Sequence, residues 1–244
     1  MSRVHFSSSL QDRRRLVALS AIAAVIAATG VAASIWLARH DPDVGSPQNA
    51  SLAKVHAVRD QFPPGYEVTE TEPRVITQKY LDELRAPVDG ASYIPAECAE
   101  PSNAGTQIPV GATIEGLRGR FNDRTITVAA METPEPMPPW PSLPQCAAVV
   151  FVKPGYIHGF LSHPGLPAVS TGATATQALR MSATLTDQNQ QDTDIVQYAY
   201  VATLDDRHFV SVTITGTPLL GQPKDIDPTP AQHLLEEAVR VLRQ

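Results

Sequence analysis

The feature that most constrains this chain is an uncharged, apolar segment near its N-terminus. Residues 16–38 contain no charged side chain and follow three consecutive arginines, Arg13–Arg15. About 20 apolar residues span the hydrocarbon core of a bilayer, so this segment is long enough to cross as one helix. Arginines on its N-terminal side favour a cytoplasmic N-terminus. The sequence therefore predicts a cytoplasmic stub (1–15), a transmembrane helix (16–38), a tether (39–50) and an extracytoplasmic domain (51–244).

A cleaved secretory signal is the alternative interpretation of the same segment. Such signals also combine a basic start, an apolar stretch and small residues at the cleavage site. Val31–Ala33, before Ser34, would serve as that site. The apolar stretch of a signal is usually 7–15 residues long, whereas this one continues through Trp36, whose ring suits the membrane interface. The retained anchor is favoured, and both interpretations place the remaining chain outside the cytoplasm.

Charge and cysteine content limit what the exported part can do. The chain has a net charge of −6, and four of its nineteen basic residues lie in the first fifteen positions, so the exported part is acidic. An acidic domain is unsuited to nucleic acid or to anionic headgroups. Cys98 and Cys146 are the two cysteines, and in an oxidising compartment they are expected to form one disulfide. A metal site is the alternative, but the C-x-x-C spacing and an adjacent histidine pair are absent.

Hydrophobic periodicity predicts strands in the middle of the exported domain and helices towards both of its ends. The predicted helices are 51–60, 77–85 (capped by Thr77) and 229–241 (capped by Thr229, with a Glu236–Arg240 pair); the predicted strands form hairpins at 112–131 and 194–214, with another strand at 174–186. Residues 146–152 fit either a buried strand or a helix, and the glycines and prolines of 154–171 predict a loop. The predicted fold class is α+β, an antiparallel sheet flanked by helices.

No familiar catalytic or cofactor-binding motif is present in the sequence. The zinc-protease, nucleophile-elbow, P-loop and dinucleotide fingerprints are all missing. His158 and His163 lie five residues apart with no third ligand nearby, so they are expected to be packing or exposed loop histidines. Asp192, Asp194, Asp205 and Asp206 lack the calcium-loop pattern and are expected to be solvated turn acids. The sequence therefore predicts no catalytic residue, metal or cofactor.

A proline-rich segment is the candidate interaction site. Residues 133–144 contain six prolines, and such segments favour polyproline II, which a partner can bind at low entropic cost. Met137 and Trp140 are of residue types enriched at binding surfaces, so they are the candidate partner-binding residues. The alternative is a stiff loop that packs Trp140 onto the sheet beside Cys146.

Several short motifs resemble secreted and membrane-anchored envelope proteins of mycobacteria and their relatives. These motifs are the Phe62–Val68 sequence FPPGYEV, the Pro95–Cys98 sequence PAEC and a second cysteine downstream, all after an N-terminal anchor. The resemblance covers most of residues 50–244. LpqN-like lipoproteins of this kind have the Mog1p/PsbP-like fold and are binding or accessory proteins. The trehalose monomycolate transport factor, a single-pass partner of the mycolate exporter, shares the plan of anchor plus domain. This chain lacks a lipobox cysteine, and the resemblance carries over no catalytic residue.

The expected function is therefore that of a single-pass, membrane-anchored envelope protein. Its extracytoplasmic domain would act as a non-catalytic binding or accessory module for an envelope or membrane protein, and the resemblance implies help in envelope lipid transport. One alternative is a secreted carrier of a lipid or small apolar ligand, which requires an apolar cavity between sheet and helices. The other is a hydrolase whose dispersed Ser, His and Asp residues converge in the folded chain.

Overall fold

The structure, a computed structural model, describes residues 52–99, 108–137, 144–163, 173, 175–187, 189–217 and 225–244. The predicted stub, transmembrane helix and tether lie outside the described residues. Within the described part of the chain, no helix is both long and apolar enough to cross a membrane. The transmembrane helix therefore stays a prediction.

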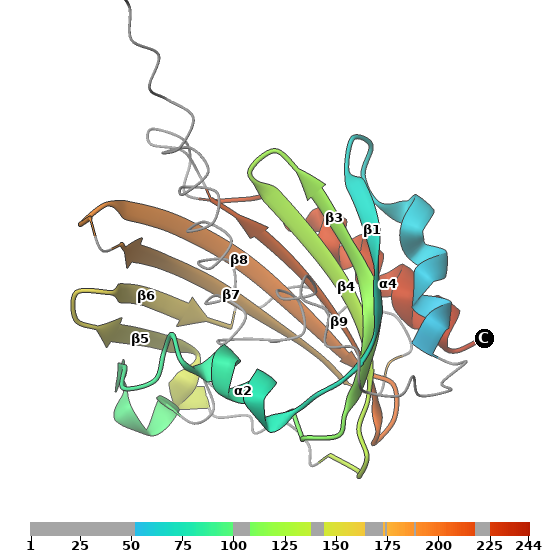
Figure 1. Cartoon of the computed structure of the whole chain (residues 1–244), viewed down its shortest axis with the longest axis horizontal. Helices are drawn as coiled ribbons and strands as arrows, with labels where there is room; N and C mark the ends of the chain where they lie inside the picture. The colour runs from blue at the N-terminus through green and yellow to red at the C-terminus, as the bar shows by residue number, and fades with distance from the viewer. Residues whose placement is uncertain are drawn as a thin grey trace, which may run out of the picture.

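Nine strands among the described residues form one antiparallel sheet, in the order β1-β3-β4-β9-β8-β7-β6-β5-β2 (Figure 1). The strands are β1 (Glu67–Val75), β2 (Ser92–Ile94), β3 (Thr113–Phe121), β4 (Arg124–Glu132), β5 (Ala148–Lys153), β6 (Ile157–Ser162), β7 (Ala175–Thr186), β8 (Asp192–Thr203) and β9 (His208–Gly216). Most neighbours in the sheet are neighbours in sequence. The exceptions are the pairs β1–β3, β4–β9 and β5–β2: β9 inserts between β4 and β8, and β2 lies beside β5 at the far edge.

Both predicted hairpins are confirmed. β3 and β4 are joined through Asn122, whose φ of 51° is a left-handed conformation that asparagine tolerates. β8 and β9 pair across the turn at Asp205–Arg207. The predicted strand at 174–186 is β7, and the ambiguous run at 146–152 is mainly strand, β5.

The loop predicted over 154–171 is wrong in part, because β6 and with it His158 lie inside that range. Ile157 and Leu161 are buried whereas His158 and Phe160 are exposed, as in a strand with one covered face. Gly159 was expected to lie in a loop, but it lies within β6 and packs against the ring of Phe151. A Cβ there would lie 2.4 Å from Cζ of Phe151, so only glycine lets that ring cover the strand.

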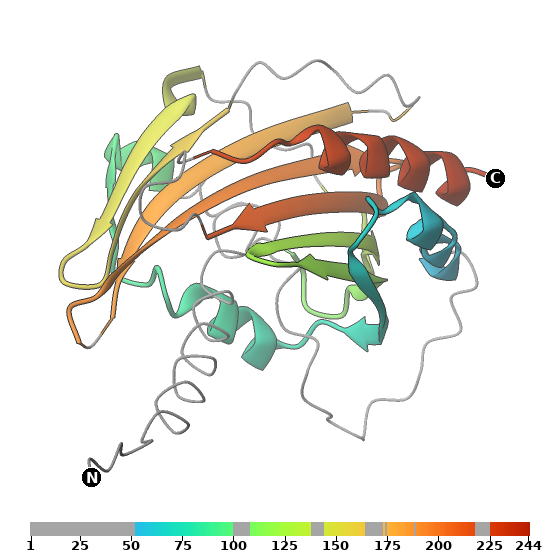
Figure 2. The ribbon, with the colours of Figure 1, turned by 90° about the horizontal axis from the view of Figure 1, so that it is seen from above.

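We call the face of the sheet that carries α4 (Thr229–Leu242) and the 3-10 helix η3 (Leu52–Gln61) the outer face (Figure 2). Each segment buries apolar residues on the side that faces the sheet. These are Leu52, Val55 and Val58 in η3, and Ala231, Leu234, Leu235, Ala238 and Val241 in α4. Helix η3 was expected as an ordinary helix but is wound more tightly.

Two details of α4 differ from the prediction. Thr229 is not the N-cap, because the helix already includes it; Pro228 takes that position, and the Asp227 carboxylate accepts from the Thr229 N–H at 3.0 Å. Arg240 pairs with Glu237 at 2.6 Å rather than with Glu236. Glu237 lies one residue closer along the helix, and i,i+3 neighbours face each other as well as i,i+4 neighbours do.

The opposite, inner face of the sheet carries α2 (Gln78–Arg85), and the sheet curves towards it (Figure 2). Thr77 caps α2 as predicted, since its side-chain oxygen accepts from the Tyr80 N–H at 3.2 Å. Leu81 and Leu84 are buried in one apolar cluster with inner-face residues from β3 to β7. Helices therefore cover both faces, which confirms the α+β class.

The FPPGYEV motif connects η3 to β1. The ring of Phe62 lies against Gly119 in β3, where a Cβ would come within 2.6 Å of it. Gly65 has a φ of 91°, which favours glycine, and Tyr66 contacts the rings of Phe62 and Phe121. Through these contacts the motif packs η3 against the edge of the sheet.

Glu115 is a buried carboxylate on the outer face, beneath η3. Its side chain is 7% exposed, and Oε1 lies 3.4 Å from Nε2 of His56. Burial raises the pKa of Glu115; the His56 charge opposes this, and the Glu70 charge adds to it. The folded protein therefore binds this proton more tightly than the unfolded chain, so stability falls as pH rises through and above the usual range for a glutamate.

We predict that Glu115→Gln raises the free energy of unfolding by about 1 kcal/mol at pH 8, because it removes a poorly solvated charge. The gain should shrink towards zero at pH 4, where the wild-type carboxyl is protonated. Urea denaturation across this pH range measures both values. Glu72→Gln, at an exposed carboxylate on β1, is the matched control and should change stability little. A loss of stability in Glu115→Gln at every pH would contradict the prediction.

Candidate functional site

The proline-rich segment that follows β4 is fastened to the turn between β8 and β9. The Thr133 N–H donates to the Arg207 carbonyl at 2.9 Å, and Nε of Arg207 donates to the Thr133 carbonyl at 2.9 Å. Four residues further on, the Met137 N–H donates to the Asp206 carbonyl at 2.8 Å. Nη2 of Arg207 also reaches Oε1 of Glu132 at 3.3 Å. The described part of the segment is therefore held in one conformation by the turn.

The two candidate partner-binding residues have different outcomes. Met137 is half-buried, and its side chain packs against the inner-face cluster while part of it stays exposed. Trp140 lies outside the described residues, so its role stays a prediction. The position of Met137 fits a residue that supports the segment and still presents an apolar surface.

Asp205 organises the β8–β9 turn. Its carboxylate accepts from the N–H groups of Arg207 and His208 at 2.8 Å each, and from Nδ1 of His208 at 2.9 Å. Partial burial raises the pKa of Asp205, but the hydrogen bonds from Arg207 and His208 outweigh it and the pKa is lowered. Asp205 was expected as a solvated turn acid; it is exposed, and it also fixes the His208 ring.

A pocket of about 310 Å³ lies beside this turn. Its lining combines apolar Leu52, Leu204, Phe209 and Leu242 with polar Asp205, His208 and Arg243. Nη2 of Arg243 donates to the Leu204 carbonyl at 3.0 Å, which joins the end of α4 to the turn. The pocket is thus built where η3, the β8–β9 turn and the end of α4 meet, and an apolar side chain could enter it between charged groups.

The other sequence-predicted acids and histidines do not converge on this pocket. Asp192 and Asp194, at the start of β8, accept from the hydroxyls of Thr186 and Thr184. His163 follows β6, with Nδ1 3.3 Å from the Ala178 carbonyl. Among the described residues, no group of three His, Cys, Asp or Glu side chains is placed to hold a metal ion. The pocket lining has a hydrogen-bonded His–Asp pair but no hydroxyl or thiol nucleophile.

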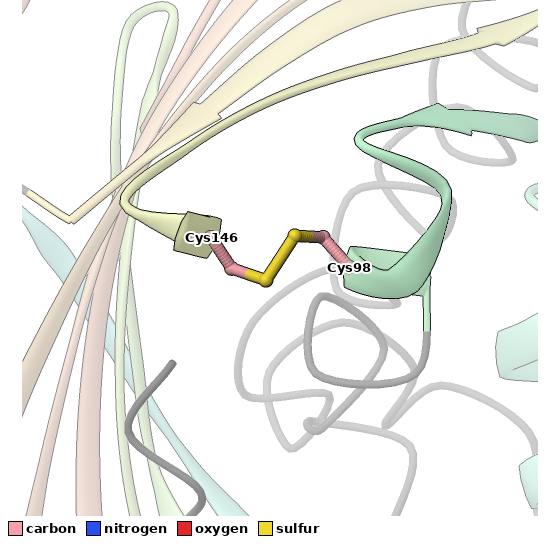
Figure 3. The surroundings of a disulfide bond; sticks show 2 residues. All are labelled: Cys98 and Cys146. Carbon is pink, nitrogen blue, oxygen red and sulfur yellow. A yellow bond between two sulfur atoms is a disulfide. The ribbon is translucent and has the colours of Figure 1, made fainter. Parts of the chain in front are cut away.

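The predicted disulfide between Cys98 and Cys146 is confirmed (Figure 3). Both cysteines are buried, and the bond joins η4 (Ala96–Cys98) to η6 (Pro144–Cys146) with a Cα–Cα distance of 5.5 Å. It closes a sequence separation of 48 residues, which restricts the unfolded chain by roughly 4 kcal/mol in the entropy model. Cys146, two residues after the proline-rich segment, is therefore cross-linked to Cys98, which follows α2 and β2 in the chain.

Sequence reasoning missed Arg207, the Asp205–His208 pair and the pocket. The local signal was present, since an aspartate that accepts from N–H groups two and three residues later is a common turn former. The contacts of Arg207 with Thr133 join residues 74 positions apart, and no periodicity reports such a pair. Local patterns could not predict the pocket either, because its lining includes Leu52 from the beginning of the domain and Leu242 from its end.

The chain belongs to the DUF5642 family, a domain of unknown function, whose model matches residues 51–243. Its fold is similar to the X-ray structure of an uncharacterized protein from Mycobacterium smegmatis, the Rv0999 ortholog, with a TM-score of 0.61 and 24% identity. That match covers 79% of this chain and 96% of the other, and it shows the fold alone. None of the curated proteins compared with the chain matches it. The comparisons give no support for the LpqN-like or Mog1p/PsbP-like names.

We predict that Arg207→Ala loosens the proline-rich segment, because it removes the side-chain bonds to Thr133 and Glu132. The free energy of unfolding should fall by about 1–2 kcal/mol. Limited digestion with a broad-specificity protease should cleave faster between residues 133 and 144, with sites mapped by mass spectrometry. Arg240→Ala removes an exposed helix pair and is the control, with a cost below about 0.5 kcal/mol and unchanged cleavage. Equal cleavage rates in the two variants would show that Arg207 does not hold the segment.

Proposed function

We propose that this protein is a membrane-anchored envelope protein whose extracytoplasmic domain binds a protein partner and performs no catalysis. The observation that carries the proposal is the fixed segment Thr133–Met137, held across the β8–β9 turn on the flank of a partly apolar pocket. A segment already ordered in the free protein loses less conformational entropy on binding, which favours affinity. We call the segment, the turn and the pocket together the docking end.

The composition of the docking end supports a protein partner. Interface hot spots are apolar or aromatic side chains seated in desolvated pockets and surrounded by polar groups. Leu204, Phe209 and Leu242 form apolar walls, and Arg243 and Asp205 supply charges of both signs at the pocket. These groups would orient a partner that inserts one apolar side chain. Trp140, a few residues beyond Met137, would add a second anchor.

The position of the docking end supports a partner in or near the membrane. Leu52, which lines the pocket, follows directly after the predicted tether and anchor. A tether of residues 39–50 spans at most roughly 40 Å when extended. A retained anchor would therefore keep the docking end within that distance of the bilayer. We also propose that the sheet with helices on both faces is of the Mog1p/PsbP type, and that the module assists envelope lipid transport.

The two other functions fit the described residues less well. A carrier of an apolar ligand needs room between sheet and helix, but Leu234 and Leu235 of α4 are fully buried against the outer face. A hydrolase would need a nucleophile beside His208, and the pocket lining supplies none. A surface that binds without chemistry accounts for the same residues more simply.

The test is chemical crosslinking in native membranes, followed by capture of the full-length chain. Leu242→Asp places a charge in the pocket wall, and Trp140→Ala truncates the second side chain proposed to contact the partner. Each should reduce capture of the wild-type partner band by roughly 30-fold, the equivalent of about 2 kcal/mol. Val150→Asp, at an exposed position on β5, is the matched control and should capture normally.

Melting temperatures of the same variants decide how a loss is interpreted. We expect all three variants to melt close to the wild type, because Val150 is exposed, Leu242 is only partly buried and Trp140 is expected to bind the partner rather than the core. A large fall for Trp140→Ala would show that this residue belongs to the core. Normal capture by both Leu242→Asp and Trp140→Ala, with a stable fold, would contradict a docking end at this place.

A further inference from the structure

The inner face of the central strands is polar where a covered sheet face is ordinarily apolar. Thr127 in β4, Gln197 in β8 and Thr213 in β9 are 3%, 3% and 2% exposed, and Arg118 in β3 is half-buried. The outer-face neighbours in the same strands, such as Val128 and Val212, are apolar and fully buried. In β4, β8 and β9 the buried polar residues therefore lie on the inner, concave side of the sheet.

The strand register brings these four side chains together. Arg118 pairs with Thr127, and Thr127 pairs with Thr213, so the three form one row across β3, β4 and β9. Directly opposed side chains have Cβ atoms about 4.5–5.5 Å apart. Gln197 pairs with Thr215, two residues along β9, and is thus the diagonal neighbour of Thr213. Ala199 lies beyond Thr213, at the β8 end of the same row.

Two donors in this group lack an acceptor in the described part of the chain. Nε of Arg118 and Nε2 of Gln197 are both buried, and neither has a hydrogen-bond partner among the described residues. A buried, unsatisfied donor costs about 1–3 kcal/mol, so a fold that keeps two on one face needs a reason. Both atoms are donors, and the group that would satisfy them must be an acceptor.

The charge of Arg118 is also uncompensated. Within the described residues it forms no ion pair, and the charge that acts on it most is that of Arg120, another cation on the same face. Burial first, and then Arg120, lower the pKa of Arg118 to about 10, so it stays protonated at neutral pH. Glu67, a carboxylate on the same face of β1, lies opposite Arg120 rather than Arg118. A buried cation without a carboxylate is suited to an anionic ligand.

We propose that the inner face of the sheet between Arg118 and Gln197 is a binding site for the phosphate or carboxylate group of a small ligand. A guanidinium presents parallel N–H donors that match the oxygens of either group. The Gln197 amide adds a neutral donor from the other side. This site lies on the sheet face and shares no residue with the docking end, so either assignment can fail without the other.

The binding test uses the full-length chain in a nonionic detergent, with three probes of increasing size: inorganic phosphate, glycerol 3-phosphate and dihexanoyl phosphatidic acid. Each is titrated against sodium chloride at equal ionic strength while the melting temperature is followed. We expect phosphate to raise the melting temperature beyond the chloride control. A rise with all three probes assigns the site to a free oxyanion, and a rise with phosphatidic acid alone assigns it to a lipid headgroup. No rise with any of the three overturns the proposal.

Variants locate the binding. Arg118→Gln should weaken the response at least tenfold in probe concentration, and Gln197→Leu about threefold or more. Arg120→Gln, on the same strand and face but exposed, is the matched control and should change the response less than threefold. Without a probe, Arg118→Gln should melt at or above the wild-type temperature, because an uncompensated cation is removed. An unchanged phosphate response in a folded Arg118→Gln variant, or a lower melting temperature with no effect on binding, would overturn the assignment.

Discussion

The whole domain depends on the burial of both faces of its central strands, β4, β9 and β8. On the outer face, residues such as Val128 and Val212 are sealed by α4 and η3. On the inner face, α2 contributes Leu81 and Leu84 to a cluster that reaches from β3 to β7. An antiparallel sheet with both faces covered needs helices on both sides, and the chain supplies them before and after the strands.

The functional features lie where this layered packing ends. At the end of the sheet near Leu52, the β8–β9 turn orders the segment after β4 and forms a pocket with both terminal helices. The Cys98–Cys146 bond fixes the residue beyond that segment. On the inner face, Arg118 and Gln197 interrupt an otherwise conventional core with unsatisfied donors. The same framework would thus present both the proposed partner surface and the proposed anion site.

Local signals in the sequence were enough for much of the fold. Alternation predicted both hairpins, and 3.6-residue periodicity predicted the buried side of α4. The presence of two cysteines in a domain expected to be exported predicted the disulfide. The prediction failed at β6, because Gly159 has a packing role that only the Phe151 ring reveals. The insertion of β9 beside β4, the Arg207–Thr133 bonds and the row from Arg118 to Thr213 depend on long-range register, which periodicity does not contain.

The central claim is that the segment entering the proline-rich region is ordered before any partner binds. Hydrogen–deuterium exchange of the Met137 amide in the oxidised, full-length chain tests this most directly, because that N–H donates to the Asp206 carbonyl. We expect exchange at least 100-fold slower than in an unstructured peptide, and faster exchange in Arg207→Ala. Exchange of the Met137 amide at the unstructured rate in the wild type would contradict a preformed docking end.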